Sequence, residues 1–155
     1  MFLTMEEPIH PITPQCCIDM VPLRPSSARK KRVLVVEDLH SIRNILVTIL
    51  ELDGYEAVWA VNGRQALEKL QLQHCDLVLM DYRLQDMDGF QATALIRDPA
   101  SCVVSPGVPI IMVSGYGHDG ILAECIAMGM NDYLAKPFSG DQLLGMVHRW
   151  ARAGH

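Results

Sequence analysis

The sequence lacks a basic excess, a long apolar run and a signal peptide. Its 155 residues carry a formal net charge of −5, which argues against a nucleic-acid-binding surface, because such surfaces are usually basic. No apolar run approaches the ~20 residues that a membrane-spanning helix needs. The N-terminus has no basic region, and Pro8, Pro11 and Pro14 interrupt any apolar one, so we expect no secretory signal peptide.

Cysteine pairs with metal-binding spacing are also missing. The chain has five cysteines, an odd number, and no CxxC or His/Cys pair has the spacing of a metal site. We therefore expect free thiols in a reducing cytosol, and thus a cytoplasmic location. The six histidines are scattered along the chain, and we assign none of them a chemical role.

Residues 1–31 differ in composition from the rest of the chain. Five prolines fall in this span, and proline disrupts both helices and central strands. We interpret the segment as a flexible tail with a basic end, Arg29-Lys30-Lys31-Arg32. The basic run could contact an acidic partner or nucleic acid, but a solubilising lead-in to the first strand is the commoner case. Met5 and Met20 leave the natural start of the chain open.

From residue 32 onward, short apolar runs alternate with segments of helical periodicity. The runs predict buried strands, and apolar residues three and four positions apart predict amphipathic helices. In the first helix this apolar stripe is Ile42, Ile45, Leu46, Ile49 and Leu50. We expect strands at 33–36, 56–60, 77–80, 108–113 and 132–135, and helices at 41–53, 63–73, 89–97, 119–128 and 139–151. This alternation predicts an α/β fold, a doubly wound five-stranded parallel sheet with five flanking helices, in one domain over residues 32–152.

Polar side chains follow four of the predicted strands, at the point where each strand ends. Glu37-Asp38 follow the first strand, Asp81 the third, Ser114 the fourth and Lys136 the fifth. The carboxyl ends of strands converge in an open parallel sheet, which is where such sheets bind ligands. Each residue alone has an ordinary interpretation, such as a turn, a helix-terminal acid or a surface lysine. Together, three carboxylates, a hydroxyl and an ammonium suit a divalent cation and a phosphoryl group carried by a carboxylate.

In this order, the motifs resemble the receiver (phosphoacceptor) domain of two-component response regulators, in its stand-alone, single-domain form. The resemblance covers about residues 31–151 and implies the flavodoxin-like strand order 2-1-3-4-5. The matching residues are Glu37-Asp38, Asp81, Ser114-Gly115, Tyr133, Lys136-Pro137-Phe138, Met87-Asp88-Gly89 and Asn62-Gly63.

The resemblance implies a phosphorelay role and a ligand set. Asp81 would accept a phosphoryl group from a histidine kinase or a histidine phosphotransfer protein. Mg²⁺ would be held directly by Asp38, Asp81 and the backbone carbonyl of Arg83, and through water by Glu37. Lys136 would pair with Asp81 and then with the phosphoryl oxygens. The domain would assist its own phosphorylation and dephosphorylation without being an enzyme in the usual sense.

The resemblance also implies a switch. Ser114 would bind a phosphoryl oxygen, and Tyr133 would turn inward into the space that Ser114 vacates. The face made by the fourth helix, the fifth strand and the fifth helix would then bind an unknown downstream protein or a second copy of the chain. Its candidate apolar patch is Ile121, Ile126, Met128, Met130, Met146 and Trp150. The chain ends soon after the fifth helix, so we expect no output domain and signalling by protein–protein contact.

Two departures from the family pattern affect the expected behaviour. Gln85 stands where the family often has proline, which predicts a more mobile loop after Asp81. Arg83 and Tyr116 occupy positions where the family varies to tune autodephosphorylation, so the phosphoryl lifetime is open.

Three alternatives stay open. A haloacid-dehalogenase-type phosphatase would need a second catalytic aspartate where Arg83 stands. A pseudo-receiver would bind partners without phosphorylation, and the chain could also be a receiver segment of a larger kinase.

Overall fold

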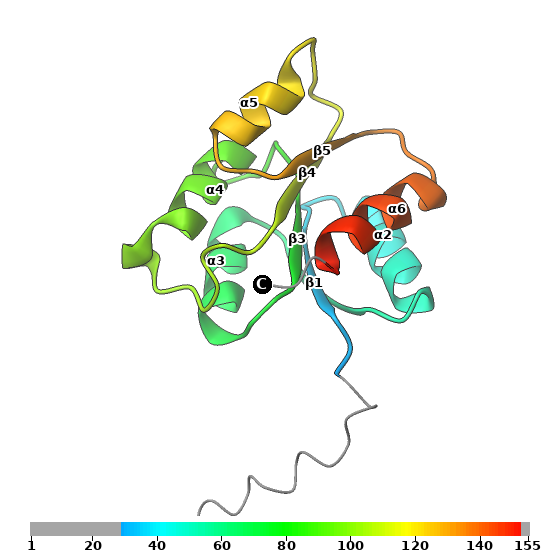
Figure 1. Cartoon of the computed structure of the whole chain (residues 1–155), viewed down its shortest axis with the longest axis horizontal. Helices are drawn as coiled ribbons and strands as arrows, with labels where there is room; N and C mark the ends of the chain where they lie inside the picture. The colour runs from blue at the N-terminus through cyan, green and yellow to red at the C-terminus, as the bar shows by residue number, and fades with distance from the viewer. Residues whose placement is uncertain (1–28, 153–155) are drawn as a thin grey trace, which may run out of the picture.

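Five parallel strands form a single sheet in the computed structural model, which describes residues 29–152 (Figure 1). The strands are β1 (Arg32–Val36), β2 (Glu56–Ala60), β3 (Leu77–Met80), β4 (Ile110–Ser114) and β5 (Asp132–Ala135). Their order is β2-β1-β3-β4-β5, with all neighbours parallel. The predicted fold class and strand order are confirmed.

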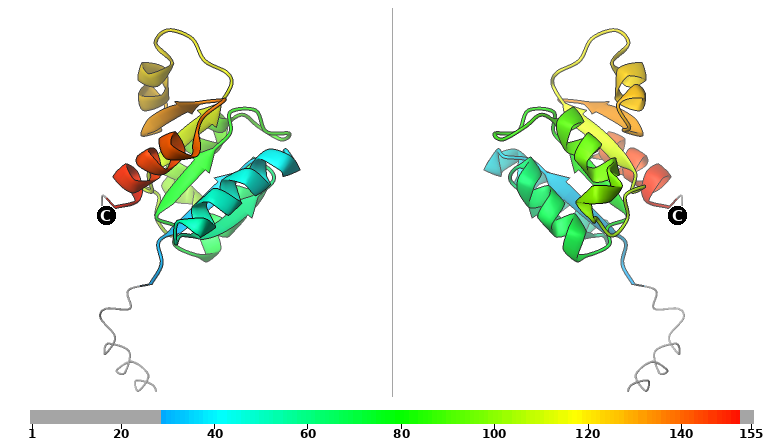
Figure 2. Two further views of the ribbon diagram at one scale, coloured as in Figure 1. Left: turned by 90° about the vertical axis from the view of Figure 1, so that its right-hand side faces the viewer. Right: turned by 90° about the vertical axis from the view of Figure 1, so that its left-hand side faces the viewer.

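Helices cover both faces of the sheet, as two views of the ribbon show (Figure 2). α2 (His40–Leu52) and α6 (Gly140–Ala151) pack on one face. α3 (Gly63–Leu72), α4 (Gly89–Arg97) and α5 (Ile121–Ala127) pack on the other, and a short 3₁₀ helix, η3 (Pro99–Ser101), follows α4. Because side chains alternate along each strand, the sheet divides the apolar core into two layers.

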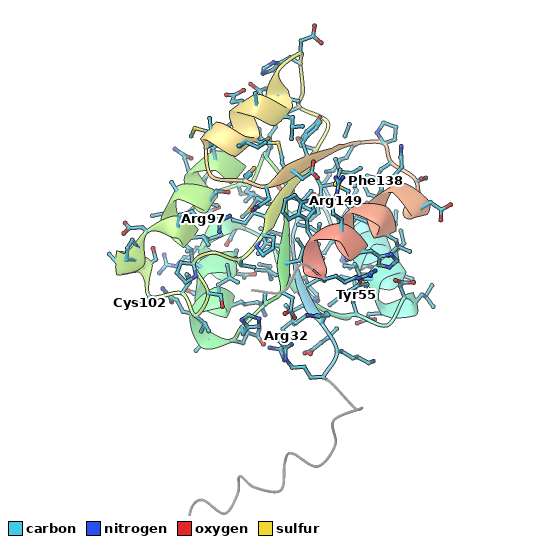
Figure 3. The ribbon with its side chains drawn as sticks, viewed as in Figure 1. Arg32, Tyr55, Arg97, Cys102, Phe138 and Arg149 are labelled. Carbon is cyan, nitrogen blue, oxygen red and sulfur yellow. The ribbon has the colours of Figure 1, made fainter. Side chains whose placement is uncertain are left out.

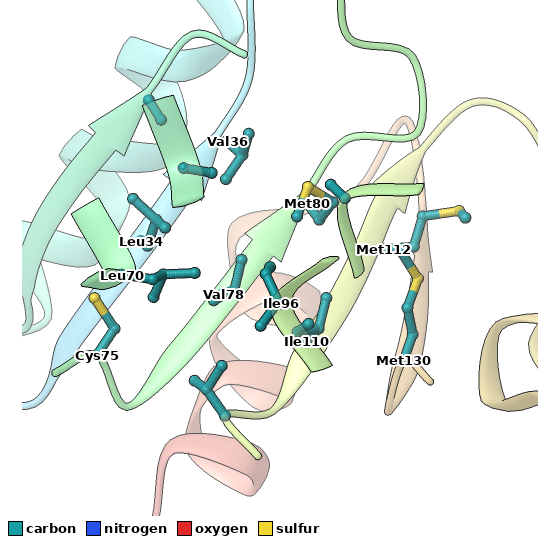
Figure 4. Close-up of a cluster of buried hydrophobic side chains, with 14 of the residues drawn as sticks. Leu34, Val36, Leu70, Cys75, Val78, Met80, Ile96, Ile110, Met112 and Met130 are labelled. Carbon is teal, nitrogen blue, oxygen red and sulfur yellow. The ribbon is translucent and has the colours of Figure 1, made fainter. Parts of the chain in front are cut away.

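The central strands are apolar on both sides because helices bury both. All four residues of β3 and all five of β4 are buried. On one face Leu34, Val78 and Ile110 pack with Leu70 of α3 and Ile96 of α4 (Figure 4). The register pairs Val36 with Met80 and Met80 with Met112, so the residues that follow β1 and β3 leave the sheet at the same level.

Local signals set several element boundaries. Ser139 caps α6 by accepting the N–H of Gln142 at 3.0 Å, and the Gln142 side chain accepts the N–H of Ser139 at 2.8 Å. This reciprocal capping box agrees with the predicted start of the last helix.

Two predicted starts are wrong by two residues and one predicted exposure is wrong, whereas the other predicted bounds agree with the structure within one residue. β4 begins at Ile110 rather than residue 108, because Pro109 has no N–H to add to a ladder. α5 begins at Ile121 rather than residue 119, after Gly120, whose φ of 89° is left-handed. Ile45, predicted on the apolar stripe of the first helix, is 54% exposed.

The tail prediction for residues 1–28 lies outside the described residues. Within the described part of the chain, the basic segment before β1 contacts the domain. The Arg29 guanidinium donates to both carboxylate oxygens of Asp76, at 3.2 and 3.3 Å. The carbonyl oxygen of Lys31 accepts the N–H of Glu56 at 2.9 Å, a hydrogen bond of the first residue pair, Arg32 and Glu56, between β1 and β2.

Two further properties concern residues 29–152 only. No helix in this range is both long and apolar enough to cross a membrane. The three cysteines in the range, Cys75, Cys102 and Cys125, are free. Burial raises the pKa of Cys75 and Cys125 to about 11 each, so both thiols stay protonated near neutral pH.

Candidate functional site

The structure brings three carboxylates together where β1 and β3 end. Oxygen atoms of Glu37, Asp38 and Asp81 all lie within 4.8 Å of one another. Glu37 and Asp81 are buried, at 1% and 8% exposure, and Asp38 is partly exposed. A cluster made of oxygen donors fits a hard divalent cation such as Mg²⁺, whereas thiolate and imidazole ligands would suit softer metals.

Lys136 supplies the positive charge at this cluster. Its Nζ lies 2.9 Å from Glu37 Oε1 and 3.7 Å from Asp81 Oδ1. The sequence-based prediction paired Lys136 with Asp81, but the shorter contact is with Glu37. Burial raises the pKa of the Glu37 carboxyl, the hydrogen bond from Lys136 opposes this, and the negative charge of Asp81 raises it further. Lys136 therefore offsets part of the repulsion among the carboxylates.

An open cavity of about 490 Å³ lies over these groups. Its lining residues are Asp38, Leu39, Asp81, Arg83, Ser114, Gly115, Tyr116 and Lys136. The predicted polar groups from four strand ends, those of β1, β3, β4 and β5, thus share one cavity with Arg83 and Tyr116. The space suits a small, charged ligand such as a phosphoryl group with a hydrated ion.

The loop after Asp81 is anchored at its far end by α4. Asp88 accepts the N–H of Gln91 at 2.8 Å, and the Gln91 side chain accepts the N–H of Asp88 at 2.9 Å, a second capping box. Gly89 follows, where a Cβ atom would lie only 2.8 Å from the Asp81 carbonyl oxygen. The Met-Asp-Gly motif therefore lets α4 begin directly behind Asp81.

Asp86 fastens the same loop to α3, a contact that the sequence analysis missed. Its carboxylate accepts the N–H groups of Gly63 and Arg64, both at 2.9 Å. Burial alone would raise the pKa of Asp86, but these backbone donors outweigh burial and lower it. Tertiary contacts thus hold the loop that contains Gln85.

Ser114 and Tyr133 share one hydrogen-bonded segment. Ser114 Oγ accepts the N–H of Tyr116 at 3.0 Å. The Tyr133 hydroxyl donates to the carbonyl oxygens of Ser114 and Tyr116, at 3.2 and 3.1 Å. Gly117 leaves room for this hydroxyl, because a Cβ atom there would collide with it. The tyrosine is therefore already packed against the segment that connects β4 to α5.

Tyr116, which lines the cavity, belongs to a group of packed aromatic rings. The Tyr82 ring lies on the Tyr116 ring with centroids 4.4 Å apart and planes inclined by 11°. Phe90 meets the Tyr82 ring edge-on at 5.3 Å. Sequence spacing gave no signal for this stack, since 34 positions separate the two tyrosines and only the β3–β4 pairing brings them together.

Comparison with known proteins gives the family. A family model described as the response regulator receiver domain matches residues 33–148. The chain is 38% identical over 132 residues to the CAI-1 autoinducer sensor kinase/phosphatase CqsS of Vibrio cholerae, covering 85% of this chain and 19% of that protein. It is 33% identical over 118 residues to the transcriptional regulatory protein KdpE of Staphylococcus aureus, covering 76% of this chain and 48% of KdpE. The chain thus spans about half or less of these relatives.

Solved structures agree with this match. The receiver domain of the sensor histidine kinase PA1611 from Pseudomonas aeruginosa superimposes with a TM-score of 0.70 at 34% identity, over 79% of this chain and 98% of that one. That structure is described with a magnesium ion coordinated in its active site cleft. The chemotaxis protein CheY4 of Vibrio cholerae gives a TM-score of 0.71 at 30% identity, over 79% and 99% of the two chains. This chain belongs to the response regulator receiver domain family, the phosphoacceptor domains of two-component signalling.

Proposed function

We propose that Asp81 accepts a phosphoryl group from a histidine kinase or a histidine phosphotransfer protein. The observation that carries this proposal is the cluster of Glu37, Asp38 and Asp81 beside Lys136, at one cavity. An oxygen of Asp81 bonds to phosphorus while the bond between phosphorus and the donor nitrogen breaks. A carboxylate is a weak nucleophile and repels the donor phosphate, so the site has to align the donor and supply positive charge.

The donor set fits Mg²⁺. Asp38, Asp81 and the backbone carbonyl of Arg83 would hold the ion directly, and Glu37 would do so through water. When bound, the ion neutralises negative charge on the carboxylates and on the phosphoryl group. Lys136 would contribute a second positive charge, and its ammonium could move from Glu37 toward the phosphoryl oxygens. The Ser114 hydroxyl then binds a further phosphoryl oxygen.

An apolar groove beside the cavity supports a docking role for the phosphodonor. The groove is lined by Ile42 and Ile45 of α2 and by Lys136, Pro137 and Phe138 after β5, and Figure 3 labels Phe138. An incoming helix that buries apolar side chains here would bring its histidine to the Asp81 cavity, because Lys136 lines both. Ile45 is exposed in the free chain and would be covered by the donor.

Output is proposed to run through the face formed by α5, β5 and α6, towards a downstream protein or a second copy of the chain. The predicted patch on this face needs correction, because Ile121 and Met130 are buried core residues, at 8% and 3% exposure. Met146 and Trp150 are partly buried and pack on the core. Exposed apolar side chains here are Leu122, Ile126 and Met128. A phosphate mimic such as beryllofluoride should enrich the bound partner or dimer, and equal recovery without it would favour a phosphorylation-independent module.

The proposal is tested by labelling with a small phosphodonor. The full chain should gain the mass of one phosphoryl group when it is incubated with the phosphodonor and Mg²⁺. It should not gain this mass when a chelator is present from the start of the incubation. Asp81→Asn should not be labelled, whereas Asp98→Asn, in an exposed loop, should be labelled like the wild type. Equal labelling of Asp81→Asn and the wild type would contradict the proposal.

A further inference from the structure

A buried arginine contacts the backbone of the loop that carries Glu37 and Asp38. Arg43, in the second turn of α2, is 8% exposed. A guanidinium is costly to bury, and a cation near a helix N-terminus opposes the helix dipole. Neither helix stability nor burial therefore accounts for an arginine at this position.

The acceptors of Arg43 belong to the loop that carries two of the three carboxylates. Its Nη1 donates to the carbonyl oxygen of Glu37 at 3.0 Å and to that of Asp38 at 3.4 Å. Its Nη2 lies 3.1 Å from Nδ1 of His40, which accepts because an arginine can only donate. Among the described residues Nε has no hydrogen-bond partner. The hydrogen bonds of the guanidinium thus go to the backbone of Glu37 and Asp38 and to His40 in the first turn of α2.

The Trp59 ring also contacts the Arg43 guanidinium. The Cζ atom of Arg43 lies 4.6 Å from the centre of the Trp59 ring, on the edge strand β2. A cation over the face of an indole ring is attracted by the ring, and this attraction helps to fix the position of the guanidinium. Trp59 is 46% exposed, so burial of its ring does not by itself explain its place on this strand.

We propose that Arg43, supported by Trp59, is a positioning residue for divalent-cation binding. It fixes the carbonyl groups of Glu37 and Asp38, and thereby the direction in which their side chains leave β1. Groups outside a metal's ligand set that orient its ligands typically change metal affinity by roughly 10–100-fold. This inference rests on the proposed function, because it concerns the cation that the carboxylate cluster would hold.

Arg97 provides a matched control. It is a partly buried arginine whose guanidinium also binds backbone carbonyls, but it is the last residue of α4 and its acceptors precede β4 and β5; Figure 3 labels it. It donates to Pro106 and Val108, both at 2.7 Å, and to Gly129 at 2.8 and 3.0 Å. Replacing it removes a comparable set of hydrogen bonds without touching the carboxylate loop.

The test is calorimetric titration of the full chain with Mg²⁺ alone, together with the melting temperature of each variant without the ion. Arg43→Gln should weaken Mg²⁺ binding roughly 10–100-fold. The Mg²⁺ affinity of Arg43→Lys should lie between those of Arg43→Gln and the wild type, because an ammonium keeps the charge but lacks the planar guanidinium group. Trp59→Leu should weaken binding less than Arg43→Gln. Arg97→Gln should lower the melting temperature and leave the Mg²⁺ dissociation constant unchanged.

The outcomes separate the inference from the proposed function. If the wild type binds Mg²⁺ and folded Arg43→Gln binds it equally well, the positioning role is wrong and the proposed function stands. If Arg43→Gln does not fold, an unchanged dissociation constant in Arg43→Lys overturns the role in the same way. If Arg97→Gln weakened Mg²⁺ binding as much as Arg43→Gln, the loss would be a general effect of lowered stability, and the positioning role of Arg43 would also be wrong. A wild type that binds no Mg²⁺ would overturn both proposals.

Discussion

At the scale of single residues, the site depends on how the positive charge of Lys136 offsets the negative charges of the carboxylates. Glu37 is almost fully buried and lies near two other carboxylates, while Lys136 contacts it at 2.9 Å. Removing one partner of a buried ion pair leaves an uncompensated charge, which costs far more than the pair itself contributes. Lys136 is thus expected to stabilise the fold of the cation-free chain as well as to serve phosphorylation.

Replacing Lys136 tests this balance. Lys136→Met should lower the free energy of unfolding by about 3 kcal/mol without a divalent cation. Added Mg²⁺ should stabilise the variant more than the wild type, because the variant has more uncompensated negative charge for the ion to neutralise. Chemical denaturation with and without Mg²⁺ measures both effects, with the exposed Lys30→Met as control. A variant as stable as the wild type in the absence of Mg²⁺ would contradict the argument.

The sequence predicted which residues gather at the strand ends, but it did not predict which of their side chains contact each other. Glu37, Asp38, Asp81, Ser114 and Lys136 stand directly after apolar runs, so their convergence followed from the parallel topology. That Lys136 lies closer to Glu37 than to Asp81 depends on side-chain positions that no spacing encodes.

The supporting groups behind the site had no sequence signal at all. Acids in loops and arginines in helices are common, so residue type alone does not single out Asp86 or Arg43. Their roles depend on contacts with α3 and β2 that only the folded chain reveals.

At the scale of elements, the loop between β3 and α4 is held by capping interactions. Asp86 accepts two N–H groups at the start of α3, and such a capping interaction is worth roughly 0.5–2 kcal/mol. Asp86→Ala should therefore destabilise the chain by about 1 kcal/mol. It should also speed amide hydrogen exchange in residues 82–88 and at the start of α3. Asp119→Ala, in another exposed loop, is the control, and unchanged exchange in Asp86→Ala would contradict the proposed fastening.

Asp76 stabilises the opposite end of the sheet, where β1 and β3 begin. It is 5% exposed and accepts the N–H of Arg32 at 2.7 Å, with Arg29 and His74 as further donors. Burial alone would raise the pKa of Asp76, but these donors outweigh burial and lower it below the usual 3.8. A lowered pKa in the folded state means that the carboxylate stabilises the fold above the unfolded pKa. This stability is lost as the pH falls through the folded pKa.

The Asp76 argument gives a pH-dependent prediction. Asp76→Asn should be about 1.5–3 kcal/mol less stable than the wild type near neutral pH. The difference should shrink as the pH falls below about 4, where the wild-type carboxyl also becomes protonated. Denaturant titrations across this range would show it, with Asp119→Asn as the control. A difference that does not change with pH would mean that Asp76 acts through packing and not through its charge.

Element boundaries were predictable where local signals are strong. The strands at 56–60, 77–80 and 132–135 and the helix at 89–97 have the predicted bounds. The two largest errors, of two residues each, fall at Pro109 and before α5, where the chain around Gly120 delays the start of the helix. The other predicted bounds differ from the structure by one residue at most. The exposed position of Ile45 was missed because helical periodicity shows an apolar stripe without showing how wide the covered part is.

At the scale of the whole molecule, the proposed switch connects the cavity to the face of α5, β5 and α6. Ser114 ends β4, and its neighbour in the sheet is the last residue of β5. The Tyr133 hydroxyl holds the segment after β4 through two carbonyl groups. A phosphoryl group can shift this arrangement only if it binds one state better than the other, and the Ser114 hydroxyl would supply that differential contact.

Ser114→Ala tests the coupling. Losing a hydrogen bond to a charged group costs about 1.5–3 kcal/mol, which would repopulate the inactive state by roughly ten-fold or more. The variant should still be phosphorylated at Asp81 but show a reduced response to beryllofluoride. Amide chemical shifts around Tyr133 and Lys136 report the response. A full wild-type shift pattern in Ser114→Ala would show that the signal takes another route.

The central claim is that Asp81 carries the phosphoryl group, and its position along the chain can be measured directly. The chain is treated with a small phosphodonor and Mg²⁺, the acyl phosphate is trapped by borohydride reduction, and the reduced residue is located by peptide mass spectrometry. We predict a single reduced aspartate at position 81, absent without Mg²⁺. Reduction at Asp38 or Glu37 instead of Asp81, or at no carboxylate of the cluster, would contradict the account.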